Sequence, residues 1–515
     1  MDDFSTEEEP RDVRERAKAR RRKVVIIVLV ILLCVIAFAM VLAFSFVNRN
    51  HGEKNDTNTG RFSKAAVATD VPECSEMGSS ILQAGGSAVD SAITSMLCIG
   101  LVHGQSSGIG GGTFMLIYDR EAKETKFIDA RETAPAATTP DMFNSDPKST
   151  EYGALAIATP GELKGMWEAH QKYGKLSWKE LFEPVIALAR KGFPVTNHTA
   201  RALGNLVASG ESWMPVSQAW KDVYYKDNGT RPKEYGDIVI RSNYADTLQR
   251  IANVGLSEFY SGHTADMIMQ DINTYSEFTY VYKPKFIGYF STHELLGKNL
   301  GRFGGSSGRT LHSRSSSELV VLILNVFKNS DTRRYNSYTN RDTRLQSTSL
   351  IFGCKIMSAT TGIIYNNQMA DFTIPNSEVE YQPTNQANYA GPNKRALSSM
   401  SGSILLDENG DVKLVIGSAG GKQIISANSW VTIDALATKS SLIDVIEKRR
   451  IHNQLFPNQG MYEAGFSTEV LTGLEDLGQM VTQGTSFAVV QAILKDKYGI
   501  EAHADSRKQG IAAGY

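Results

Sequence analysis

The sequence lacks an excess of either charge and lacks the common metal-binding patterns. Over 515 residues, 54 Lys and Arg side chains nearly balance 55 Asp and Glu side chains, which gives a formal net charge of -1. Nucleic-acid-binding proteins usually carry a basic excess, so no nucleic-acid partner is expected. The chain has no His-Glu-x-x-His sequence and no paired Cys and His ligands, so we expect neither a metal nor another cofactor.

The charges are unevenly distributed at the N-terminus. Residues 1–23 hold eight basic side chains between Arg11 and Lys23, and an uncharged apolar run, residues 24–47, follows directly. Such a run exceeds the roughly 20 residues that a helix needs to cross a bilayer. The alternative is a cleaved signal peptide, whose apolar core is only about 7–15 residues long. Because basic residues favour the cytoplasmic side, we expect a single-pass type II membrane protein with a cytoplasmic tail, a lipid-embedded anchor and an extracellular or lumenal ectodomain.

Cysteine is scarce as well. There are four cysteines, and one of them, Cys34, lies inside the apolar run. In an oxidising compartment, Cys74 and Cys98 are the expected disulfide and Cys354 is expected to stay free. Three N-glycosylation sequons fall on the side predicted to be lumenal, and they begin at Asn55, Asn197 and Asn228.

Beyond the apolar run, the pattern predicts a mixed α/β (α+β) ectodomain. Residues 48–62 are polar and indicate a linker, and residues 63–515 form the ectodomain. Helical spacing of apolar residues predicts helices over Ser75–Gln83, Val89–Gly100, Glu162–Tyr173 and Trp178–Lys191. Alternation and turn signals predict strands over Ala65–Thr69, Thr113–Tyr118, Thr125–Asp129, Ile404–Leu406 and Val412–Ile416. Residues 278–346 are loop-like, with one apolar island at Leu319–Phe327.

The stretch from Asn366 to Gly421, together with Arg131, carries the chemistry that a small zwitterion requires. Asp371 can accept an ammonium group, the pair Ser398-Ser399 can donate to a carboxylate, and Gly420-Gly421 can offer backbone N–H groups to an oxyanion. The Arg131 guanidinium can hold a carboxylate through two parallel N–H groups. Each feature alone has an ordinary alternative: a surface arginine, a helix or turn cap, a local turn or a glycine-rich strand exit. The combination favours a binding site.

Two other patterns favour structural roles. The run Gly108–Gly112 follows a predicted helix and precedes a predicted strand, whereas a dinucleotide-binding loop needs the reverse order. We expect a tight turn where backbones approach closely. His452 is more often a hydrogen-bonded structural histidine than a base.

In order along the chain, these strings resemble the gamma-glutamyltransferase (glutathione hydrolase) family. The matching strings are Cys74–Glu76, Gln83–Asp90, Gln105–Gly112, Ala130–Pro135, Thr159–Leu163, Gly353 onward through Gly421, Asp505–Gly510 and Ala513–Tyr515. The resemblance implies an N-terminal-nucleophile hydrolase fold, a four-layer αββα sandwich. The large-subunit-like part would end near residue 328, the small-subunit-like part would span 347–515, and the junction 278–346 would be divergent or shortened.

The resemblance also implies a reaction. Family members are precursors that cut themselves into a large and a small chain, and the cut frees a threonine. Its hydroxyl attacks a gamma-glutamyl carbonyl while its own α-amine serves as base. The implied substrates are glutathione and its conjugates, with an acceptor amino acid or dipeptide for transfer.

The residues that the resemblance places in the substrate site are Arg131, Ser349, Gln368, Asp371, Ser398, Ser399, Gly420 and Gly421. Arg131 and the two serines would hold the substrate α-carboxylate. Gln368 and Asp371 would hold the α-ammonium, and the two glycines the oxyanion. Ser349 falls near the family's asparagine.

The chain departs from the family in two places. Ala370 replaces the first of two acidic residues before Phe372, and the family's nucleophile sequence, Gly-Thr-Thr-His or Gly-Thr-Ala-His, does not occur. The run Leu319–Phe327 matches an apolar helix of the family. The hydroxyls nearest in sequence to the expected nucleophile are Thr332, Thr339, Thr343 and Thr348. The two hypotheses are therefore a gamma-glutamyl hydrolase or transferase, and an inactive, unprocessed homologue that binds gamma-glutamyl compounds or a partner.

Overall fold

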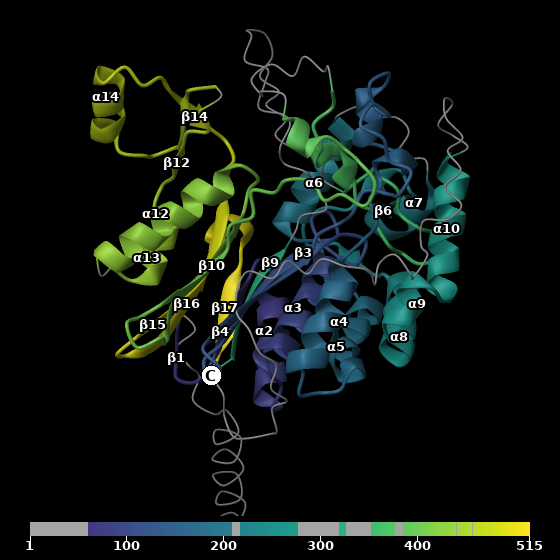
Figure 1. Cartoon of the computed structure of the whole chain (residues 1–515), viewed down its shortest axis with the longest axis horizontal. Coiled ribbons are helices and arrows are strands. Elements are labelled where there is room, and N and C mark those ends of the chain that lie inside the picture. The colour runs from purple at the N-terminus through teal and green to yellow at the C-terminus, as the bar shows by residue number, and fades with distance from the viewer. Residues whose placement is uncertain are drawn as a thin grey trace, which may run out of the picture. The chain divides into compact units, whose positions relative to one another are not determined.

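The computed structural model describes residues 60–208, 217–276, 319–325, 352–375, 385–438, 440–455 and 457–515. All of them belong to one compact unit, Asn58–Tyr515 (Figure 1). The predicted tail and membrane anchor, residues 1–47, lie outside the described residues. Within the ranges given above, no helix combines the length and the apolar character that a membrane span requires.

Two sheets form the centre of this unit. In the described ranges the larger sheet has the strand order β1-β16-β15-β11-β10, and all neighbours in it are antiparallel. Its strands are β1 (Arg61–Phe62), β16 (Gly499–Ala504), β15 (Val489–Asp496), β11 (Val412–Ala419) and β10 (Ser403–Leu406). The second sheet has the order β4-β3-β9, with β4 (Glu124–Ala130), β3 (Thr113–Asp119) and β9 (Leu319–Asn325). A ribbon of β2 (Ala66–Thr69) and β17 (Ile511–Gly514) joins the start of this unit to its C-terminal end.

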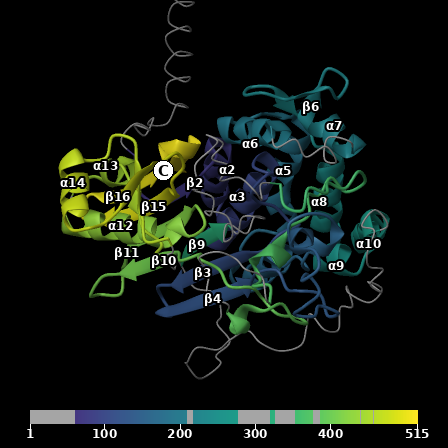
Figure 2. The same ribbon diagram turned by 90° about the horizontal axis from the view of Figure 1, so that it is seen from above.

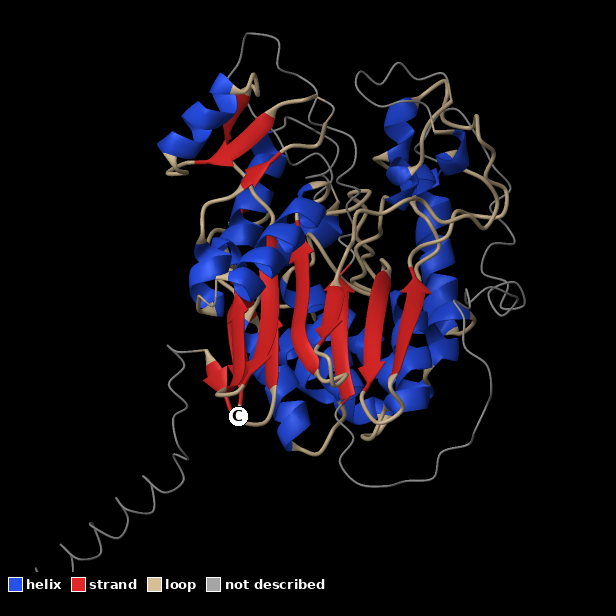
Figure 3. Ribbon diagram, turned by 60° about the vertical axis from the view of Figure 1, so that its left-hand side comes forward, coloured by secondary structure: helices blue, strands red, loops and turns tan. Residues whose placement is uncertain are grey.

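Side chains of β3 alternate between two apolar cores, as the period of two in a strand requires. Met115 and Ile117 lie in the large core formed with the helices. On the opposite face, Tyr118 packs with Val412 and Val415 of the larger sheet. The two sheets therefore face one another, and each has an outer face for helices (Figures 2 and 3).

Helices cover both outer faces. The helices α2 (Pro72–Gln83) and α3 (Ala88–Val102) contact β2, β17 and β9, while α12 (Gln423–Ala437) and α13 (Leu442–Glu447) contact β11, β15 and β16. Further helices on the first side are α4 (Glu162–Tyr173), α5 (Trp178–Lys191), α6 (Asn197–Ala208), α7 (Gln218–Tyr224), α8 (Ser242–Val254), α9 (Leu256–Tyr260) and α10 (His263–Ser276). A small sheet of β12 (Ile451–His452), β13 (Gly460–Glu463) and β14 (Val481–Gly484) lies beside α14 (Thr468–Asp476).

Most of the sequence-based predictions for this unit are confirmed. The helices α4 and α5 have the predicted bounds, α2 and α3 agree within a few residues, and both predicted hairpins are present. Cys74 and Cys98 form a disulfide that joins α2 to α3, and Cys354 is buried and takes no part in this disulfide. At the end of the stretch predicted as a linker, Phe62 is buried in β1. The mixed helix and sheet class is likewise as expected.

One assignment is wrong: the run expected to match a helix at Leu319–Phe327 forms the strand β9 instead. All seven residues of Leu319–Asn325 pair antiparallel with Thr113–Asp119. Length and composition explain the error, because a short apolar run rich in Val and Ile fits a buried strand as well as a helix segment. The strand conformation is stabilised because the edge of β3 offers backbone hydrogen-bond partners to this run.

Candidate functional site

Arg131 lies directly after β4, at the end of the sheet where Ala130 pairs with Thr113. Its side chain is only 4% exposed, and its Nη2 atom donates to Asp371 Oδ2 at 2.5 Å and to the Leu397 carbonyl at 2.7 Å. Arg395 Nε donates to the Arg131 carbonyl at 3.1 Å. The guanidinium is therefore fixed from several segments of the chain. It is a buried ion-pair partner and not a surface arginine.

Asp371 and Gln368 lie on one short 3-10 turn, η3 (Gln368–Asp371). The Gln368 amide donates to the same Asp371 Oδ2 atom that Arg131 contacts. Asn366 anchors this turn, because its side chain accepts from the backbone N–H of Gln368 and Ala158 and donates to the carbonyls of Ala158 and Gly110. The carboxylate thus sits in a rigid, buried turn.

Two polar atoms of this cluster are buried without a hydrogen-bond partner in the part of the chain that the structure describes. They are Arg131 Nε, which can only donate, and Gln368 Oε1, which accepts. Leaving such atoms unpaired is costly, so they mark positions where a ligand's own groups would be stabilised. A carboxylate suits the donor and an ammonium suits the acceptor, which is the charge pattern of a zwitterion.

The two serines are tied to their surroundings in different ways. Ser398 Oγ accepts from the Met400 N–H at 3.2 Å, which is the local turn contact that short polar side chains often make. Ser399 Oγ donates to the Gly421 carbonyl at 2.7 Å. The serine pair therefore lies between the Leu397 carbonyl, which contacts Arg131, and the glycine turn.

Gly420 and Gly421 form the turn from β11 into α12. Their φ angles are +148° and +57°, in the region that favours glycine. A Cβ atom on Gly420 would lie 2.6 Å from Ala488 Cα, so the backbones of these two residues are in direct contact. A turn at the start of a helix presents backbone N–H groups and a partial positive charge, which is suited to an oxyanion.

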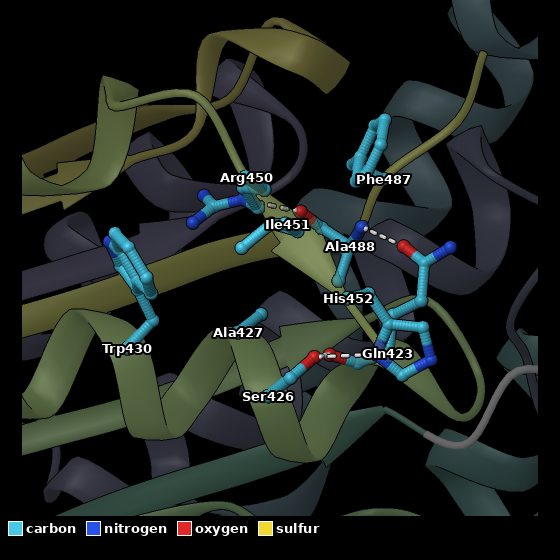
Figure 4. Close-up of a pocket in the computed structure, with 9 residues that line it drawn as sticks. All are labelled: Gln423, Ser426, Ala427, Trp430, Arg450, Ile451, His452, Phe487 and Ala488. Carbon is cyan, nitrogen blue, oxygen red and sulfur yellow. Dashed lines mark hydrogen bonds between the residues drawn. The ribbon is translucent and has the colours of Figure 1, made fainter. Parts of the chain in front are cut away.

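Ala488, which contacts Gly420, is held by residues that line a small pocket (Figure 4). The Ala488 N–H donates to Gln423 Oε1 at 2.8 Å, and Arg450 Nε donates to the Ala488 carbonyl at 3.0 Å. His452 also lines this pocket and its Nδ1 lies 2.8 Å from Ser426 Oγ. Burial lowers the pKa of the His452 imidazole, so it is neutral near pH 7. These contacts fit the structural role expected of His452.

The glycine run Gly108–Gly112 packs backbone against backbone, as expected. A Cβ on Gly110 would lie 2.4 Å from the Ile364 carbonyl oxygen, and the Gly111 carbonyl accepts from the N–H of Gly161 and Glu162. The preceding residues Gly104–Gly108 fit the Gly-x-Ser-x-Gly pattern of nucleophile elbows. They lie between α3 and β3, whereas an elbow needs a strand followed by a helix. This segment is therefore a packing element.

The structure brings together seven of the eight predicted site residues, through contacts among Arg131, Gln368 and Asp371, through Leu397 beside the serines, and through Ser399 to the glycine turn. Ser349 lies outside the described residues, as do Thr332, Thr339, Thr343 and Thr348. The strand β9 ends at Asn325 opposite Thr113, at the Arg131 end of the sheet. The first residue of β9, Leu319, is about 20 Å from Asn325 along the strand and therefore lies at the other end of the sheet.

The sequence offered no signal for one residue of this site, Asn388. It is the buried last residue of the short 3-10 helix η4 (Gln386–Asn388), which has neither periodicity nor a recognised motif, and its side chain joins the Asp371 and Leu397 backbones. No group of three or more His, Cys, Asp or Glu side chains in the described ranges is placed to hold a metal ion.

Comparisons with a family model and with individual proteins indicate the same family. Residues 74–344 and 336–515 match the family model described as gamma-glutamyltranspeptidase. The chain is 31% identical to Scoloptoxin SSD14 of Scolopendra dehaani, covering 91% of this chain and 96% of that protein. It is 30% identical to Glutathione hydrolase proenzyme 2 of Schizosaccharomyces pombe, covering 92% of this chain and 91% of that protein.

The fold is similar to that of the cephalosporin acylase from Bacillus halodurans, with a TM-score of 0.66, 17% identity and coverage of 88% of this chain and 96% of the other. At this identity the likeness concerns the fold. The alignment with the Scolopendra protein spans 556 positions, more than the 515 residues present here, so it includes positions at which this chain has no residue.

Proposed function

The chain belongs to the gamma-glutamyltranspeptidase family, and from this premise we propose that it hydrolyses or transfers the gamma-glutamyl group of extracellular glutathione and its conjugates. The proposed fold is the family's N-terminal-nucleophile hydrolase arrangement, a four-layer αββα sandwich. The proposed precursor cuts itself into a large and a small chain. The name of the Schizosaccharomyces pombe relative, a proenzyme, supports this part of the proposal.

The observation that carries the proposal is the buried ion pair of Arg131 and Asp371 with an unpartnered donor and an unpartnered acceptor beside it. In the absence of substrate the two charges neutralise each other. A free α-amino acid end brings a carboxylate and an ammonium together, so it can replace one buried ion pair with two. A ligand with a single charge could replace the ion pair at only one of Arg131 and Asp371, so one buried ion pair would be lost without a second in exchange, which is destabilising.

The chemistry then depends on the glycine turn. A hydroxyl attacks the gamma-glutamyl carbonyl carbon, its proton passes to a base, and the developing oxyanion is stabilised by N–H groups at Gly420-Gly421. The C–N bond of the amide breaks and the leaving amine takes up a proton. Water or an acceptor amine then attacks the resulting gamma-glutamyl ester, which distinguishes hydrolysis from transfer.

Two measurements on the purified full chain test this proposal. Self-processing predicts two fragments on a denaturing gel, and turnover predicts release of a chromogenic amine from a gamma-glutamyl anilide. N-terminal sequencing of the smaller fragment would identify the nucleophile. A fragment that begins at none of the Thr or Ser residues of 326–351, or release of amine without any fragment, would contradict the proposed mechanism.

The second candidate function is an unprocessed homologue that binds gamma-glutamyl compounds, or a partner, without turnover. The absence of the family's nucleophile sequence from the whole chain favours it. It predicts a single full-length band and no amine release, while glutamate still binds at Arg131 and Asp371. Amine release at a rate that follows the appearance of fragments would exclude this alternative.

We further propose that the ectodomain faces the cell exterior or a lumen, with residues 24–47 as its anchor. Support comes from the basic flank before the apolar run and from the sequon at Asn228, which lies in the exposed turn between β6 (Tyr225–Lys226) and β7 (Arg231–Pro232). A glycosidase that removes N-linked glycans should shift the protein on a gel, and Asn228→Gln should reduce that shift. An unmodified Asn228 in protein made by a secretory cell would count against this topology.

A further inference from the structure

We propose that Asn388 is a positioning residue that holds Arg131 and Asp371 at the spacing of an α-amino acid's two charges, so that the site selects α-amino acids over β-amino acids. The inference rests on the proposed function of these two residues as binding groups. It adds a determinant of selectivity that makes no direct contact with the ligand.

Asn388 closes a ring of hydrogen bonds around the ion pair. Its Nδ2 donates to the Asp371 carbonyl at 2.8 Å, and its Oδ1 accepts from the Leu397 N–H at 3.0 Å. The same two residues are joined by Arg131, whose Nη2 donates to Asp371 Oδ2 at 2.5 Å and to the Leu397 carbonyl at 2.7 Å. The guanidinium and the carboxamide thus each link the segments of Asp371 and Leu397.

The carboxamide itself has little freedom. Asn388 is 6% exposed, and Nδ2 also lies 3.3 Å from Thr373 Oγ1. Its backbone is fixed too, because the Asn388 carbonyl accepts from the Thr373 N–H at 2.9 Å and its N–H donates to the Asn385 carbonyl at 2.9 Å. A side chain held at both ends in this way transmits the position of one segment to the other.

Only an asparagine side chain fits these demands. The ring needs a donor facing a carbonyl and an acceptor facing an N–H, on a short planar group. An aspartate would keep the acceptor for Leu397 but place a carboxylate oxygen against the Asp371 carbonyl, where both atoms are acceptors. A glutamine would be one carbon too long for the same two partners.

The ring fixes where Asp371 stands relative to Arg131 and to the serines that follow Leu397. In glutamate the ammonium and the α-carboxylate share one carbon, whereas in its isomer β-glutamate (3-aminopentanedioate) an extra carbon separates them. The two isomers have the same charges and composition. A site whose binding groups are held at one spacing therefore distinguishes the two isomers. A site in which Asp371 is no longer held by Asn388 does not.

The test is calorimetric titration of the purified full chain with L-glutamate and with β-glutamate. We expect the unmodified protein to bind L-glutamate at least about tenfold more tightly, and Asn388→Asp to reduce this ratio to about twofold or less, since one lost buried hydrogen bond corresponds to about a tenfold change in affinity. Asn388→Asp removes the bond to the Asp371 carbonyl, whereas Asn388→Ser removes the bonds to both Asp371 and Leu397 without adding charge, and it should lower the ratio in the same way. The ratio is measured on one preparation, so it does not depend on the fraction of folded protein.

Asn385→Asp is the matched control, because the exposed Asn385 side chain accepts from the Ala387 N–H and an aspartate keeps that acceptor. It should leave the ratio unchanged. The inference would be overturned if both Asn388 variants retained the ratio, or if the unmodified protein bound the two isomers equally. In either case, binding of L-glutamate would still support the proposed function. Failure of the unmodified protein to bind L-glutamate would overturn the proposed function, and this inference with it.

Discussion

At the scale of single residues, the central feature is a pair of opposite charges that stabilise each other where water does not reach. Arg131 and Asp371 are 4% and 5% exposed, and neither charge would be stable there alone. The same arrangement prepares the site for a ligand that carries both charges. Binding would then exchange partners without creating an isolated buried charge, which is why we propose free zwitterions as the ligands.

Replacing Arg131 by lysine tests whether the planar guanidinium matters beyond its charge. A lysine keeps the positive charge but cannot present two parallel N–H groups to a carboxylate, so Arg131→Lys should weaken L-glutamate binding about tenfold or more. Arg190→Lys is the control, since Arg190 forms an exposed ion pair with Asp246. Equal affinity in both variants and in the unmodified protein would show that Arg131 does not bind the carboxylate.

The residues of the site differ in how far the sequence could predict them. Arg131, Asp371 and the glycine pair could be predicted, because a guanidinium, a carboxylate and available backbone N–H groups in combination favour a binding site. Asn388 does not stand out, because a loop asparagine is usually a solvated turn former and only the fold places its amide between two distant segments. Burial of a polar loop residue is a property of tertiary structure.

At the scale of elements, the turn between β11 and α12 depends on the absence of a side chain. Gly420→Ala would place a methyl group against Ala488 at a φ of +148°, so it should destabilise the fold by about 2 kcal/mol or more and abolish any turnover. Denaturant unfolding measures the first effect. Gly473→Ala on α14 is the control: no atom lies within 4 Å of the added Cβ, and the change should be neutral or stabilise by up to about 1 kcal/mol. Similar losses in both variants would contradict the packing argument.

Helices and strands with strong local sequence signals were predictable, and elements that depend on pairing with another strand were not. The helix α5 has a capping box at Ser177 and Glu180 and a continuous apolar face, so its bounds follow from the sequence. The strand β9 has no such signals, and its seven residues became a strand because β3 offers a pairing partner in register. The secondary structure of a short apolar run therefore depends on the elements that lie beside it in the fold.

At the scale of the whole molecule, the C-terminal segment holds distant parts of the unit together. β17 pairs with β2 near the start of the unit, and Glu447 at the end of α13 accepts from His503 of β16 at 2.8 Å and from Ser506 Oγ at 2.6 Å. Pairings between the two ends of a chain leave no local pattern. They could not be predicted from the sequence, although Asp505–Gly510 and Ala513–Tyr515, which take part in them, are among the strings of the family resemblance.

The Glu447 contacts predict a defined acid sensitivity. Burial acts to raise the pKa of the Glu447 carboxyl, but the hydrogen bonds from His503 and Ser506 outweigh it and lower the pKa from 4.5 to about 2. A carboxyl whose pKa is lower in the folded state contributes stability above its unfolded pKa, and this contribution is lost as the pH falls from about 4.5 toward 2. Glu447→Gln should therefore lower the melting temperature at pH 7 more than at pH 3. The exposed Glu475→Gln on α14 is the control, and equal effects at both pH values would refute the prediction.

The proposed site binds a zwitterion, and calorimetric titration of the full chain with three ligands is the direct test of this property. L-glutamate carries both charges at one end, glutarate lacks the ammonium, and 4-aminobutanoate lacks the α-carboxylate. Because a ligand with a single charge cannot replace the buried ion pair at both Arg131 and Asp371, we expect saturable binding of L-glutamate and at least about a hundredfold weaker binding of the other two. Glutarate or 4-aminobutanoate binding as tightly as L-glutamate, or no binding of L-glutamate at all, would contradict this expectation.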